Sequence, residues 1–120
     1  MKKRILRCAA ALLCACTVLG TGMTCYAATG KTYGTISSSR VYGVFEYPEQ
    51  GHHLEVELFA TIRDKDYGTS TVKKFANSSW GTLTSVSKDA TAGSGYAFTN
   101  LDVYGLVDGN VNGSMTNLKP

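Results

Sequence analysis

The sequence predicts an all-β protein, a small antiparallel β-sandwich of about six or seven short strands, with a small barrel as the alternative. Residues 53–63 alternate apolar and polar side chains, which is the period of a strand with one buried face. Residues 28–120 are rich in Thr, Ser, Val, Tyr and Gly, a composition that favours strands joined by turns. No segment after residue 28 repeats its apolar residues about every 3.6 positions, so we expect no helix there.

Seven segments fit strands, in chain order: 32–37, 40–47, 53–63, 72–76, 80–87, 96–107 as one long strand or two short ones, and 111–118 as a weak last strand unless residues 110–120 are a frayed tail. Pro48 and the turn at residues 49–51 end the second segment. A turn at residues 64–68 follows the strongest segment, and residues 88–95 form a loop. Asp108-Gly109 is a hairpin signal.

Two of these segments have faces that the side chains define. The buried face of residues 53–63 consists of Leu54, Val56, Leu58, Ala60 and Ile62. One face of residues 80–87 consists of Trp80, Thr82, Thr84 and Val86. At residues 72–76 the Lys73-Lys74 doublet and the lone Phe75 leave the buried face undefined, so we expect a bulge or an edge position there.

Residues 1–27 have the pattern of a secretory signal peptide that is removed after Ala27. The basic residues at its start are Lys2, Lys3, Arg4 and Arg7. An apolar run of about a dozen residues follows, whereas a membrane span needs about 20. Cys25 and Ala27 are the small residues before the cut. The alternatives are an uncleaved N-terminal anchor and lipid attachment at Cys16.

Every cysteine of the chain lies in this leader: Cys8, Cys14, Cys16 and Cys25. Residues 28–120 are therefore expected to form a single secreted, extracellular domain without disulfides, thiolate metal sites or a transmembrane segment. This part has eight basic and nine acidic residues, a net charge of −1. The positive charge of the whole chain belongs to the leader, so we expect no nucleic-acid partner.

The residues after the sixth segment resemble the first half of a calcium loop. Asp108, Asn110 and Asn112 match D-x-N-x-N-G, which places three short oxygen-bearing side chains inside one tight turn. The complete loop needs a bidentate Glu at its twelfth position, and Lys119 stands there instead. The alternative is a hairpin turn without a metal, and we expect no resident metal or other cofactor.

The exposed face of the strongest strand carries His53, Glu55 and Glu57. Such a face could hold a metal ion weakly; the alternative is a solvated face with the glutamates opposite Lys73 or Lys74. The sequence contains no nucleophile elbow, no phosphate-binding loop and no nucleophilic cysteine outside the leader. We therefore expect a protein that is not an enzyme.

Aromatic residues are more numerous than a core of this size needs. Tyr42 and Phe59 fall on strand faces that we expect to be outer ones, and exposed aromatic rings on a rigid sheet commonly hold sugar rings or lipid headgroups. The residues expected to contact a ligand are Tyr42, Phe59, Trp80 and Tyr96. The alternative is that the aromatic rings cover the ends of the sandwich.

A set of short motifs resembles one known family. The motifs are Tyr33-Gly34, Val41-Tyr42, Phe45, Pro48, His52, Val56, Ser79-Trp80-Gly81, Tyr96 and Phe98. Their order is similar to that of the lactococcin 972 type of secreted bacteriocin. This sequence departs from the family in the acidic Glu55 and Glu57, and in continuing to Pro120 beyond the aromatic strand.

The resemblance implies a small antibacterial protein of Gram-positive origin that binds lipid II, a cell-wall precursor, outside the target cell. It implies no catalytic residues. The alternative function is a non-toxic extracellular or cell-surface binding module for carbohydrate or protein.

Overall fold

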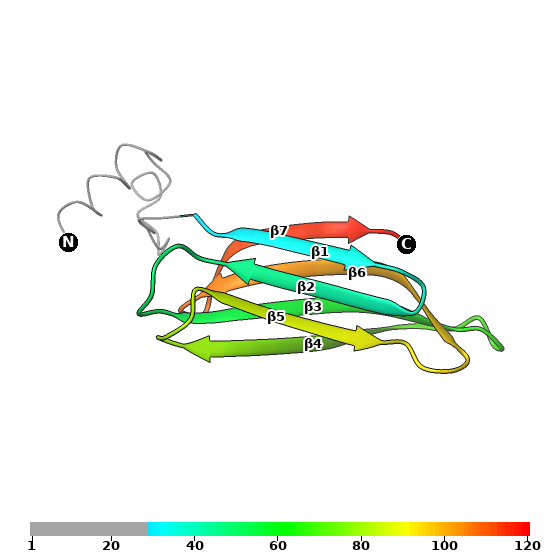
Figure 1. The fold of residues 1–120 in the computed structure, drawn as a ribbon. Coiled ribbons are helices and arrows are strands. Elements are labelled where there is room, and N and C mark those ends of the chain that lie inside the picture. Colours follow the sequence, from blue (N-terminus) through cyan, green and yellow to red (C-terminus); the bar gives the residue numbers. More distant parts are fainter. Residues whose placement is uncertain (1–28) are drawn as a thin grey trace.

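The computed structural model describes residues 29–120, which form two antiparallel sheets packed face to face, with no helix among these residues (Figure 1). The predicted β-sandwich is confirmed. Its strands are β1 (Lys31–Ile36), β2 (Arg40–Glu46), β3 (His53–Asp64), β4 (Ser70–Trp80), β5 (Ser85–Thr91), β6 (Tyr96–Val107) and β7 (Asn110–Leu118). The predicted leader and its four cysteines lie outside the described residues.

The two layers are built from three hairpins and one single strand. Strands β1, β2 and β5 form one sheet in that order, and β4, β3, β6 and β7 form the other. The hairpins β1–β2, β3–β4 and β6–β7 each stay within one sheet, as Figure 1 shows. The chain changes layer between β2 and β3, between β4 and β5, and between β5 and β6. Pairs β2–β5 and β3–β6 therefore join segments that are distant in sequence.

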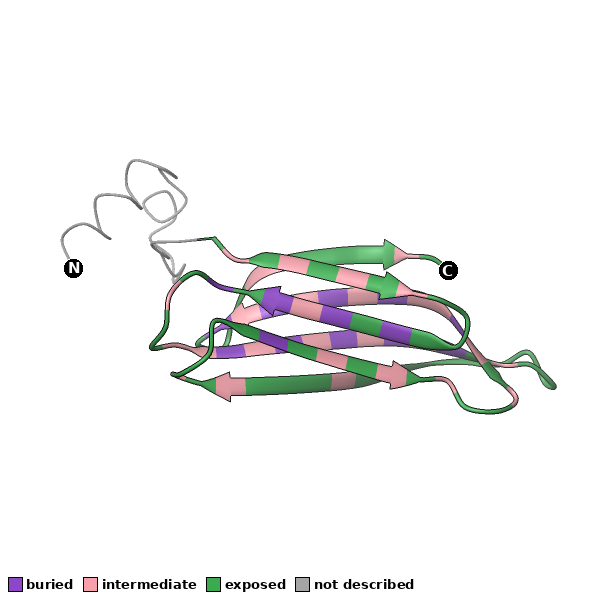
Figure 2. Cartoon of the chain, in the orientation of Figure 1, coloured by how far each residue is buried: buried purple, intermediate pink, exposed green. Residues whose placement is uncertain are grey.

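The core lies between the facing sheets, and its largest contribution comes from β3. The buried stripes in Figure 2 alternate with mostly exposed residues along β2 and with half-buried residues along β3, as strand geometry requires. The predicted buried face of β3 is confirmed in full. The buried residues are Val41, Phe45, Tyr47, Leu54, Val56, Leu58, Ala60, Ile62, Val86, Phe98, Leu101, Val103 and Val107.

Glycines on the inner faces let the two sheets approach closely. Gly43 of β2 lies over Leu58 and Val103, and an added Cβ there would be 2.8 Å from Leu58 Cδ1. Gly105 of β6 lies under the ring of Phe45, and a Cβ there would overlap that ring. Large side chains of one sheet therefore occupy the space that glycines leave open in the other.

The structure corrects the expected strand at residues 80–87 and the loop after it. Trp80 is the last residue of β4, and β5 begins only at Ser85. Gly81 has a φ of +75°, which is readily accessible only to glycine, and it reverses the chain toward the other sheet. The loop expected at 88–95 is shorter, because β5 continues to Thr91 along β2.

Two further expectations concern the edges of the four-stranded sheet. β4 is an edge strand, and its pairing with β3 has no register shift, so the edge position is confirmed and the bulge is not. Lys73 lies opposite the buried Ala60 and Lys74 opposite Phe59, so the doublet points to both faces. Inward charges of this kind protect an edge from pairing with other chains. At the other edge, β7 pairs with β6, so the last segment is a strand and not a frayed tail.

Candidate binding surface

The four-stranded sheet has one face on the core and one face open to solvent, which we call the β3 outer face. It comprises His53, Glu55, Glu57, Phe59, Lys74, Trp80, Asp102 and Tyr104. Register places them in rows: Trp80 beside His53, Tyr104 beside Glu57, and both Lys74 and Asp102 beside Phe59. The alternation that buries Leu54 and Leu58 is what turns these side chains outward.

Trp80 ends β4 on this face and is 74% exposed. Its indole ring lies parallel to the imidazole of His53, with ring centroids 3.8 Å apart and planes 12° apart. The stack fixes one side of the indole and leaves the other side to solvent. Trp80 is therefore a surface residue, and it does not belong to the buried core.

A second aromatic pair lies further along β3. The rings of Phe59 and Tyr104 meet edge to face, with centroids 5.8 Å apart and planes at 80°. Lys74 Nζ lies 5.8 Å from the Phe59 centroid and 2.8 Å from Glu57 Oε2. These side chains border a shallow depression lined by Glu57, Phe59, Val72, Asp102, Tyr104 and Val111.

The charge of the β3 outer face is negative near its centre. Glu55, Glu57 and Asp102 contribute carboxylates, and Lys74 forms an ion pair with Glu57. The hydrogen bond and the charge of Glu57 raise the pKa of Lys74 above its ordinary value of 10.5, and the charge of Glu55 adds to this effect. The expectation that the glutamates face a lysine of the returning strand is thus met by one pair, Glu57 with Lys74.

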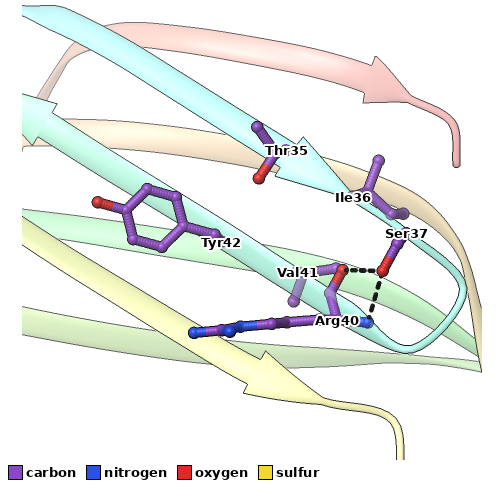
Figure 3. A pocket seen from close by; sticks show the side chains of 6 residues that line it. All are labelled: Thr35, Ile36, Ser37, Arg40, Val41 and Tyr42. Carbon is purple, nitrogen blue, oxygen red and sulfur yellow. Dashed lines mark hydrogen bonds between the residues drawn. The ribbon is translucent and has the colours of Figure 1, made fainter.

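The four residues expected to contact a ligand do not gather in one place. Trp80 and Phe59 share the β3 outer face, whereas Tyr42 lies on the outer face of the three-stranded sheet. Tyr42 borders a small hollow at the β1–β2 turn, which is shown in Figure 3. In that turn Ser37 Oγ accepts a 3.1 Å hydrogen bond from the Arg40 amide. Tyr96 pairs with Asp64 at the end of β3 opposite to Trp80.

Two of the three side chains proposed for calcium, Asp108 and Asn112, use their oxygens in protein hydrogen bonds, and Asn110 donates through Nδ2 to the Asp108 carbonyl at 3.3 Å. Asp108 Oδ2 lies 2.7 Å from His52 Nδ1, and Asp108 Oδ1 accepts the amide of His53 at 2.9 Å. Asn112 Oδ1 accepts the amide of Gly30 at 2.6 Å. The hydrogen bonds from His52 and the His53 backbone lower the pKa of Asp108 below its ordinary 3.8. The bonds of Asp108 connect the β6–β7 turn to the segment at the start of β3, and the bond of Asn112 connects β7 to the segment before β1.

His52 is the residue whose role the sequence did not reveal. Its Nδ1 faces Asp108, and its Nε2 lies 3.6 Å from Glu49 Oε1. The imidazole also meets the ring of Tyr47 edge to face, with centroids 5.3 Å apart. Only the positions of the two residues could have indicated this contact. His52 precedes β3 and Asp108 follows β6, and the start of β3 lies beside the end of β6 because these two strands run antiparallel.

Within residues 29–120, no group of three or more His, Cys, Asp or Glu side chains is placed to hold a metal ion. The same residues include no helix that is long and apolar enough to cross a membrane. No known protein family, no curated protein and no solved structure matches this chain.

Proposed function

We propose that this chain is an exported, bacteriocin-like protein that acts by binding cell-envelope material, with lipid II of competing Gram-positive bacteria as the first ligand to test. The observation that carries the binding role is the β3 outer face. Trp80 is held by His53 with one side of its ring in solvent, and Phe59 and Tyr104 lie on the same rigid sheet. Aromatic rings exposed on a rigid scaffold offer contact area at little cost in conformational entropy.

Binding is favoured over catalysis by the surroundings of His52. A catalytic histidine needs one ring nitrogen for the proton of a nucleophile or substrate. In this structure Nδ1 faces Asp108 and Nε2 faces Glu49, so carboxylates occupy both sides of the ring. We therefore propose a structural role for His52 in joining two connections of the sandwich, and no enzymatic activity.

The acidic character of the β3 outer face favours a second function, a non-toxic extracellular or cell-surface module that binds carbohydrate or protein. Lipid II carries a pyrophosphate, and Glu55, Glu57 and Asp102 would repel a phosphate placed on this face. A ligand without negative charge fits these carboxylates better.

The test uses the protein expressed from the full chain and purified from the exported fraction, with its N-terminus read by mass spectrometry. The first proposal predicts zones of growth inhibition on Gram-positive indicator strains and binding to phosphatidylcholine vesicles that contain lipid II. Binding to purified cell walls without any inhibition would replace it by the second function. Binding to neither walls nor lipid II vesicles would refute the envelope-binding role altogether.

A further inference from the structure

We propose that the β3 outer face binds one extended, uncharged glycan chain that lies along β3 and contacts both aromatic pairs. This inference rests on the proposed function and names the chemical class of its ligand. The groups proposed to contact the glycan are the Trp80–His53 pair, the Phe59–Tyr104 pair, and the carboxylates between them.

The spacing of the two aromatic pairs sets the size of the ligand. Phe59 follows His53 by six residues in one straight strand, so the two pairs are about 20 Å apart at about 3.3 Å per residue. A single small molecule cannot contact both rings. A linear polymer can, provided that it offers a similar apolar face at each end of this span.

The groups between the aromatic pairs are hydrogen-bond acceptors. Glu55 and Glu57 are two residues apart on the outer side of β3, and the Ser78 backbone pairs with that of Glu55. Within residues 29–120, the Glu55 backbone is paired in the sheet but its carboxylate makes no hydrogen bond, so the carboxylate oxygens are available to a ligand. Sugar hydroxyls donate to carboxylates, while the C–H face of a pyranose ring packs against an aromatic ring. The alternation of rings and carboxylates therefore matches a saccharide chain.

Charge distinguishes this ligand from other polymers. The lysine of this face is already paired with Glu57, and Glu55 and Asp102 add two further carboxylates to the face. A polyanion such as a nucleic acid or a sulfated glycan would meet repulsion instead of cation contacts. A folded protein partner would need about 800 Å² of well-packed surface on each side, and charged groups are depleted at the centre of such interfaces. Charges lie at the centre of this face.

The binding groups are ordered before a ligand arrives. His53 holds the indole plane by stacking, and Tyr104 holds the Phe59 ring edge to face. Both pairs sit on hydrogen-bonded strands of one sheet. A glycan would therefore bind without ordering loops, which reduces the entropic cost of association.

Trp80 is the only tryptophan of the chain, so its fluorescence reports on this face directly. The exported protein is titrated with two neutral chains, a β-linked N-acetylglucosamine hexamer and a cellohexaose. The N-acetylglucosamine monomer and heparin serve as comparisons. We expect at least one neutral chain to give a saturable change in Trp80 emission and to protect it from acrylamide. The monomer and heparin should give no saturable change at the same concentrations.

The decisive variant changes Phe59, which is distant from the fluorescent Trp80. Phe59→Leu should weaken the affinity measured at Trp80 by about tenfold, because one chain spans both pairs. Tyr33→Leu, which removes an exposed ring from β1 of the other sheet, is the matched control and should leave the affinity unchanged. Circular dichroism spectra of both variants verify the fold.

Three results would overturn the proposal: no response to either of the two neutral chains, an affinity unchanged in Phe59→Leu, or binding of heparin as tight as that of the neutral chains. If the protein still binds cell walls or lipid II vesicles in any of these cases, only the glycan site is refuted and the envelope-binding function stands. Loss of all these activities refutes the proposed function itself.

Discussion

Replacing Gly105 by alanine should destabilise the sandwich, because the ring of Phe45 occupies the space where the new methyl group would lie. The methyl carbon would overlap two ring atoms, and even the third, Cε1, would be only 2.6 Å away. Phe45 is fully buried, and Gly30 approaches the same ring from another side. The ring cannot give way without movement of a strand.

The magnitude follows from two opposing effects. Overpacking of a closed core costs about 1–3 kcal/mol, and a change from glycine to alanine recovers about 0.4–1 kcal/mol through the unfolded chain. We expect Gly105→Ala to lower the free energy of unfolding by about 1–2 kcal/mol, a large part of the stability of a small domain. Urea unfolding followed by far-ultraviolet circular dichroism measures it. Trp80 fluorescence is a poor probe because that side chain is already exposed.

A double-mutant cycle tests the stated cause. Phe45→Leu removes part of the ring and is destabilising by itself, because it leaves a cavity. In its presence Gly105→Ala should cost less by at least about 1 kcal/mol, since the overlapping atoms are gone. Losses that simply add, within about 0.5 kcal/mol, would refute the overlap with Phe45 as the reason.

Three other predictions follow from surface contacts. Trp80→Ala should cost less than about 1.5 kcal/mol in urea unfolding, because the ring only stacks on an exposed face; a loss of 3 kcal/mol or more would mean that it is core. The pKa of Asp108 is lowered by His52, so this contact stabilises the fold above pH 3.8, and its contribution is lost as the pH falls through the folded pKa. Asp108→Asn should therefore reduce the fall in melting temperature at acid pH, with a cost at neutral pH below about 1 kcal/mol. An unchanged fall at acid pH would contradict this role of Asp108. Glu57 raises the pKa of Lys74, so the ion pair stabilises the fold fully below pH 10.5, and its contribution is lost as the pH rises through the folded pKa. Lys74→Met should therefore remove part of the fall in melting temperature at alkaline pH. An identical fall in both proteins would exclude the ion pair as its cause.

The fold class and the main strand could be predicted from side-chain period alone. Leu54 to Ile62 alternate without interruption, and their burial follows directly. The break after Trp80 could not, because Thr82 and Thr84 continue the alternation into a turn that Gly81 makes possible. The alternation of apolar and polar side chains carries no information on the backbone conformation of a single glycine.

The candidate surface was predictable only in part. Alternation placed Phe59 on an outer face correctly, but it carries no information on which strand lies beside which. The contact of Phe59 with Tyr104 depends on the pairing of β3 with β6 across more than 40 residues. The contact of His52 with Asp108 has the same origin. Strand order comes from the joint burial of two sheets, which no local pattern encodes.

The bond between Gly30 and Asn112 has a consequence for the timing of processing. Gly30 is the third residue beyond the expected cut after Ala27, and its amide is held by the β7 side chain at 2.6 Å. Proteases act on locally open chain, so we expect a docked β1 to leave little open chain for a cut only three residues before Gly30. β1 pairs with β2 alone, at the edge of its sheet. We therefore expect that the leader, if it is cut after Ala27, is removed before this edge strand docks.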